Sequence, residues 1–168
     1  MKKRIRSIVL GLLIAILSAQ PIFASVGDYA LESAESRVLA EDSSKVVVQL
    51  YDRRGNWIAD GIIEISNPRN GKIGIYAETQ CYMGVDEIIM SIAVDKQVGT
   101  NQWEQVDYLT YSFSKKNNQE LTDASVDLQL SGHEANEVYR LRSVHSAILN
   151  GSSENLSGQT PGLTITDH

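Results

Sequence analysis

Three histidines, the side chains best suited to proton transfer or metal binding near neutral pH, are scattered along this chain. His133, His145 and His168 show no close spacing, and no paired cysteines accompany them. Structural and catalytic zinc sites need several ligands brought together, so the sequence predicts no metal site. His145 falls within an expected strand beside Arg142. A structural, hydrogen-bonded role is therefore favoured over a catalytic one for this histidine.

Carboxylates suited to acid–base catalysis occur at Asp86 and Asp127, but no serine lies in a Gly-x-Ser-x-Gly nucleophile motif. A hydrolase or metal-dependent enzyme would need these two carboxylates to converge with His133 and His145 from separate strands. General acid–base catalysis requires such groups within hydrogen-bond reach of one substrate. We therefore predict no catalytic residues and no cofactor. The alternative is an enzyme in which Asp86, Asp127, His133 and His145 form the active site.

Two tryptophans offer the positive indication of binding. Trp57 follows the polar residues 53–56, and Trp103 follows residues 98–101, so both lie near expected loops. Exposed indole rings bind sugars and peptides through apolar contact, which predicts a carbohydrate-binding or adhesive module. The competing interpretation is core packing, because a tryptophan at a strand start in a β-sandwich is usually partly buried. Core packing is favoured for Trp103, and the two interpretations are balanced for Trp57.

A basic cluster and an apolar run open the chain. Four Lys and Arg side chains between residues 2 and 6 precede the apolar residues 8–17, a stretch shorter than the ~20 residues that span a bilayer. Pro21 follows, and small or aliphatic residues lead up to Ala24. This is typical of a secretory signal peptide, residues 1–24, cleaved before Ser25. An uncleaved membrane anchor is the alternative. We expect a secreted, extracellular protein or one loosely associated with the cell wall, with no stable membrane insertion after cleavage.

The charge balance limits the partners. The formal net charge is −6, and removal of the four basic residues of the signal peptide makes it −10. An acidic surface repels phosphate backbones and anionic headgroups, which excludes nucleic-acid and membrane-surface binding. The single cysteine, Cys81, cannot form an internal disulfide and lies beside Tyr82 and Met83. We interpret it as a buried, unreactive side chain.

Residues 25–44, rich in Ser, Ala and Glu, are predicted to form a flexible leader, and residues 45–168 a single domain. Period-two alternation within that domain predicts strands with one buried face, about seven or eight of them. The alternating rows centre on residues 46–50, 63–65, 73–77, 88–94, 103–113, 126–130, 138–149 and 163–165. Short polar connections between the rows predict antiparallel pairing, so the expected fold class is an all-β antiparallel sandwich.

The run Tyr-Arg-Leu-Arg-Ser-Val-His at residues 139–145, followed by Asn150-Gly151, Glu154 and Thr160, resembles the last two strands of fibronectin type III and related immunoglobulin-like sandwiches. This resemblance implies that Tyr139 caps a corner between the sheets. Together with Tyr139, we expect Arg142 and His145 of the same predicted strand to be structural. The wider stretch 71–165 is similar to a family of small secreted β-sandwich proteins of Gram-positive bacteria. That family has no established activity.

These observations predict a secreted, non-catalytic β-sandwich protein that acts as an extracellular interaction module for an unidentified macromolecule or glycan. The carbohydrate-binding or adhesive module based on Trp57 and Trp103 is one alternative, and the hydrolase described above is the other. An oligomer is a further hypothesis, in which Arg140 and Arg142 pair with the acidic surface of a neighbouring copy.

Overall fold

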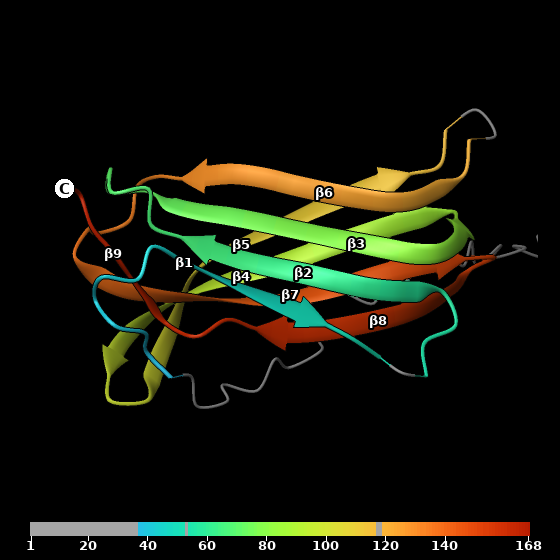
Figure 1. Ribbon diagram of the computed structural model, residues 1–168. Coiled ribbons are helices and arrows are strands. Elements are labelled where there is room, and N and C mark those ends of the chain that lie inside the picture. The colour runs from blue at the N-terminus through green and yellow to red at the C-terminus, as the bar shows by residue number, and fades with distance from the viewer. Residues whose placement is uncertain (1–36, 53, 117–118) are drawn as a thin grey trace, which may run out of the picture.

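The computed structural model describes residues 37–52, 54–116 and 119–168, in which all regular structure is β-strand (Figure 1). The predicted signal peptide and the leader up to residue 36 lie outside the described residues. The strands are β1 (Lys45–Leu50), β2 (Ile58–Ser66), β3 (Ile73–Val85), β4 (Glu87–Gly99), β5 (Gln102–Ser114), β6 (Leu121–Leu130), β7 (Glu137–Leu149), β8 (Ser152–Gln159) and β9 (Leu163–Ile165).

The strands form two antiparallel sheets that lie in two layers (Figure 1). One sheet has the order β1-β2-β3-β6, and the other has the order β5-β4-β7-β8. The short strand β9 pairs with the beginning of β7. The chain changes sheet between β3 and β4, between β5 and β6, and between β6 and β7. The prediction of an all-β antiparallel sandwich is confirmed.

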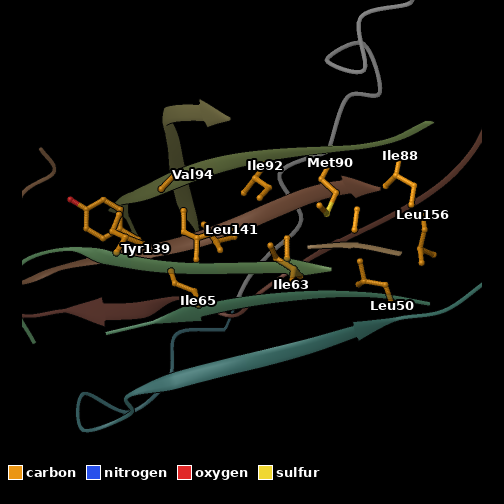
Figure 2. Packing of buried hydrophobic residues seen from close by; sticks show 14 of the residues in the cluster. Leu50, Ile63, Ile65, Ile88, Met90, Ile92, Val94, Tyr139, Leu141 and Leu156 are labelled. Atoms are coloured by element: carbon orange, nitrogen blue, oxygen red, sulfur yellow. The ribbon is translucent and has the colours of Figure 1, made fainter. Parts of the chain in front are cut away.

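Apolar side chains on alternate residues fill the space between the layers. Ile88, Met90, Ile92 and Val94 all project from one face of β4 and are fully buried. Figure 2 shows them together with Leu141 of β7 and with Ile63 and Ile65 of β2, from the opposite sheet. Burying a side chain of this size stabilises a fold by about 1.5–3 kcal/mol, so these rows supply much of the driving force for folding.

The sequence predicts one strand after residue 151, whereas the structure has two, β8 and β9. Two strands follow the tight turn at Asn150-Gly151, and both lie on the same edge of β7. Between them the Thr160 backbone N–H donates to the Leu141 carbonyl oxygen, and the Thr160 hydroxyl accepts from the Leu141 N–H. Pro161 has no N–H to continue the ladder, so the edge is interrupted there. The strand that sequence reasoning missed is β8, which has a single buried apolar residue, Leu156.

Part of the predicted leader lies against the sandwich. Val38 forms an isolated parallel bridge with Gly162, and the Leu39 N–H donates to the Gly162 carbonyl oxygen at 2.8 Å. Leu39 packs against the hydrophobic core. The packed region therefore includes Val38 and Leu39, which precede the predicted domain start at residue 45.

A buried ionic cluster occupies the outer face of the second sheet. The Asp95 carboxylate accepts from Arg140 Nε at 3.0 Å and from Arg142 Nε at 2.7 Å. Arg140 is fully buried, and its guanidinium carbon lies 4.4 Å from the centre of the Trp103 ring. Arg142 also contacts Gln105. Arg140 and Arg142, which the oligomer hypothesis pairs with a neighbouring copy, both bind Asp95 within the chain, and Arg140 is fully buried.

A polar bridge crosses the core between the two layers. His145 Nδ1 of β7 lies 2.8 Å from the Thr79 hydroxyl of β3, and His145 Nε2 lies 3.1 Å from the Ser143 hydroxyl. All three side chains are buried. Burial lowers the pKa of His145 to about 4, because the charged imidazolium would lose its hydration.

Replacing Asp95 with Asn should leave the buried guanidinium group of Arg140 and the partly buried one of Arg142 without this carboxylate. We expect the free energy of unfolding to fall by about 3–5 kcal/mol, the usual cost of breaking a buried ion pair. Urea denaturation measures this change. Asp123→Asn, on an exposed position of β6, is the matched control and should stay within about 0.5 kcal/mol. A loss below about 1 kcal/mol in Asp95→Asn would show that the cluster contributes little.

The His145 bridge should make stability dependent on pH. The folded pKa, about 4, lies below the value near 6.5 of an unfolded chain, so only the unfolded state binds the proton between these values. Stability from this group is fully present above pH 6.5 and is lost as pH falls to about 4, by about 3 kcal/mol. Comparison of unfolding curves of the wild type and His145→Gln across that range isolates the effect. Parallel curves for the two proteins would contradict it.

Candidate functional site

The most exposed aromatic side chains of the described residues gather at one end of the sandwich. Tyr82 is 70% exposed and Tyr51 is 63% exposed. Together with Asp52 and Ala59 they line a hollow of about 320 Å³, which we call the tyrosine hollow. Tyr51 and Asp52 directly follow β1, Ala59 lies in β2, and Tyr82 lies near the end of β3. Three segments of one sheet therefore build the site.

The loop beside the hollow is fixed by a carboxylate from the opposite sheet. Glu154 of β8 accepts backbone hydrogen bonds from Asn56 and Trp57 through Oε2 and from Ile58 through Oε1, at 2.8–3.0 Å. A side chain at Gly55 would collide with this carboxylate, since a Cβ there would lie 2.7 Å from Glu154 Oε1. Hydrogen bonds to a charged acceptor are about twice as strong as neutral ones. This contact holds the loop that connects β1 to β2.

The loop in turn meets the strand that carries the exposed tyrosine. The Tyr82 N–H donates to the Trp57 carbonyl oxygen at 2.8 Å. The backbone shifts register between Ile58 and Asp60 where β2 pairs with β3, so Ala59 lies in an irregularity of the ladder. Such irregularities reorient side chains at sheet ends. The side of the hollow formed by Ala59 and Tyr82 is therefore held by backbone hydrogen bonds.

The two tryptophans do not form one platform. Trp57 is half-buried and packs against the core beside the hollow. Trp103 is half-buried under the Arg140 guanidinium, and its ring approaches Gly162 so closely that a Cβ there would lie 2.8 Å away. The β4–β5 turn and the connection between β1 and β2 lie at opposite ends of the sandwich (Figure 1). Trp103 is the second residue of β5, directly after the first of these, and Trp57 directly precedes β2 at the end of the second.

The residues expected to be structural have defined partners. The Tyr139 hydroxyl donates to the Glu134 carbonyl oxygen at 2.8 Å, five residues earlier in the chain. This is the contact that a tyrosine makes at the corner of immunoglobulin-like sandwiches. Burial raises the pKa of Tyr139 above its usual range. Arg142 joins the Asp95 cluster and His145 joins the Thr79 bridge.

The four residues of the hydrolase alternative do not come together. His145 lies in the core, Asp127 lies on an exposed position of β6, and His133 contacts Asp107 at 3.3 Å. The Asp86 carboxylate accepts from the Asn150 backbone N–H at the turn between β7 and β8. Among the described residues no group of three or more His, Cys, Asp or Glu side chains is placed to hold a metal ion.

Cys81 lies next to the tyrosine hollow in sequence and is half-buried. Burial, together with the nearby carboxylates of Glu154 and Asp123, raises the pKa of its thiol to about 11. The reactive thiolate is therefore a very small fraction at neutral pH.

Sequence reasoning missed the residues that form the hollow. Residues 80–84 (Gln-Cys-Tyr-Met-Gly) break the period-two alternation of β3, and that break was the available signal. The role of Glu154 has no local signal, because its backbone partners lie about 97 residues earlier.

Comparisons with protein families, with characterised proteins and with solved structures found no match to this chain. No helix in the part of the chain that the structure describes is long and apolar enough to cross a membrane.

Replacing Glu154 with Ala should release the loop beside the hollow, because three backbone N–H groups lose their acceptor. In a Trp103→Phe background, where Trp57 is the only tryptophan, we expect its fluorescence emission to shift to longer wavelength as water reaches the ring. The free energy of unfolding should fall by about 2–3 kcal/mol. Ser153→Ala, the exposed neighbour on β8, is the control. Unchanged emission and stability in Glu154→Ala would refute the clamp.

Proposed function

We propose that this chain is a secreted, non-catalytic interaction module that binds an extracellular glycan at the tyrosine hollow. One observation carries the proposal: Tyr51 and Tyr82 are the two most exposed aromatic side chains described, and they flank the same hollow. Exposed large apolar side chains that gather at one place typically mark interaction sites. Glu154 holds the backbone of Asn56, Trp57 and Ile58, and the Trp57 carbonyl oxygen accepts from the Tyr82 N–H, so little ordering of this side of the hollow is required on binding.

The chemistry of the lining favours a sugar. Tyrosine rings offer apolar faces for the C–H groups of a pyranose and a hydroxyl that hydrogen-bonds at the rim. The Asp52 carboxylate can accept from sugar hydroxyl groups or pair with an amino group. The chain has a net charge of −6 before any signal peptide is removed, which disfavours strongly anionic polymers. Neutral or amino-bearing glycans fit this site best.

One further feature supports an extracellular role. Residues 1–24 have the basic cluster, short apolar run and small residues of a secretory signal peptide. Rigid strands that present a site on their connecting ends are a common arrangement for recognition.

The tyrosines should account for most of the binding. We expect the purified chain to cosediment with insoluble peptidoglycan or to bind members of an oligosaccharide array, and Tyr51→Ala/Tyr82→Ala to weaken binding at least about tenfold. Val98→Ala removes an exposed apolar side chain at the β4–β5 turn and is the control. Circular dichroism verifies that each variant is folded.

Absence of binding to peptidoglycan and to every oligosaccharide would contradict the proposal, as would wild-type binding by the double tyrosine variant. Binding to an immobilised peptide library alone would show that the site recognises polypeptide and would overturn the assignment to glycans.

A further inference from the structure

The four outer strands of the two sheets differ in how well they are protected against pairing with another chain. β1 has six residues and begins with Lys45. β6 carries Asp123 and Asp127. β8 contains Glu154, and Pro161 follows it. Short length, charged side chains and proline are the usual devices that prevent edge-to-edge association.

β5 lacks these devices over most of its length. It has 13 residues and lies at the end of the strand order β5-β4-β7-β8, so no described strand pairs with its outer edge. Its second half, Tyr108–Ser114, reads Tyr-Leu-Thr-Tyr-Ser-Phe-Ser. This segment has no charge, no proline and no glycine, and it is rich in aromatic side chains. Such a segment on a free edge is a template for strand addition.

The side chains of this segment also leave apolar surface accessible. Leu109, Tyr111 and Phe113 share the face of β5 that is directed toward the core, yet each is only half-buried. On the other face Tyr108 is 41% exposed. The flank of the sandwich at β5 is therefore incompletely covered, and added strands would bury more of these side chains.

We propose that β5 pairs antiparallel with β5 of a second copy of this chain, with the two-fold axis at Tyr111. In this register the two copies of Tyr111 face each other and Leu109 faces Phe113 of the partner subunit. Cross-strand pairs of aromatic and aliphatic side chains stabilise antiparallel sheets. Each Asp107 then lies opposite Lys115 of the partner subunit, so opposite charges meet at both ends of the uncharged segment.

The flanking charges select this register over its neighbours. In a two-fold symmetric pair of antiparallel strands, residues directly opposite each other must project from the same face of the joined sheet. Neighbouring registers that meet this condition differ by a shift of the two-fold axis by one residue along β5. An axis at Thr110 would place Asp107 opposite Phe113 of the partner subunit. An axis at Ser112 would place Leu109 opposite Lys115 of the partner subunit. Both alternatives set a charge against an apolar side chain, and the register centred on Tyr111 avoids this.

The interface does not use the tyrosine hollow, and the proposal does not rest on the proposed function. A dimer formed in this way joins two five-stranded sheets into one and leaves residues 51, 52, 59 and 82 outside the paired segment. Two hollows would then be presented by one particle, which strengthens binding to a repeating polymer.

Sedimentation velocity of the purified chain over a concentration series tests the pairing. We expect a monomer–dimer equilibrium, and we expect Thr110→Lys to raise the dissociation constant at least about tenfold, because it brings two lysines together near the axis. Thr110 is exposed on β5. Ser125→Lys, an exposed position on the outer strand β6, is the matched control and should leave the equilibrium unchanged.

A charge exchange tests the register. Lys115→Glu should weaken the dimer about three- to tenfold, and Asp107→Lys/Lys115→Glu should restore it. A monomer at all concentrations up to about 1 mM would overturn the proposal. So would a dimer that persists in Thr110→Lys or is lost in Ser125→Lys. Failure of the charge exchange to restore association would refute the register centred on Tyr111.

Discussion

The packing of two apolar surfaces against each other is the constraint on which the remaining structure depends. Each antiparallel sheet has one apolar face, and no described helix covers either sheet, so the two faces bury one another. Ile63 and Ile65 from one layer share a core with Ile92 and Leu141 from the other (Figure 2). Every strand must keep its register for this to hold, because a slip by one residue would turn its apolar row to the solvent.

Carboxylate side chains bind parts of the structure that lie outside the apolar core. Glu154 binds the loop between β1 and β2, and Asp86 accepts from the backbone of Asn150 at the β7–β8 turn. Asp95 satisfies two arginines on the outer face of the second sheet. Each contact joins residues far apart in sequence. Some of the acidic side chains in this negatively charged chain therefore have a structural role.

Period-two alternation predicted the apolar strands well, since an antiparallel sheet with one buried face imposes that pattern on rows such as Ile88 to Val94. It failed for β8, where Leu156 is the only buried apolar residue and backbone pairing alone defines the strand. Site residues were harder to predict. Arg140 is indistinguishable in sequence from a surface arginine, because its carboxylate partner lies 45 residues earlier. Tyr82 gave only a break in alternation. A contact between residues on different strands produces no recognisable pattern in the sequence around either residue.

Glu154, on a strand of the second sheet, fixes the loop beside the exposed tyrosines through its three backbone hydrogen bonds. Amide hydrogen exchange of the purified chain tests it most directly, because it reads the individual backbone N–H groups. The account predicts strong protection of the amides of Asn56, Trp57 and Ile58, comparable with that of neighbouring strand residues although two of the three lie in a connection. Exchange of these three amides at the rate of an unstructured peptide would contradict it.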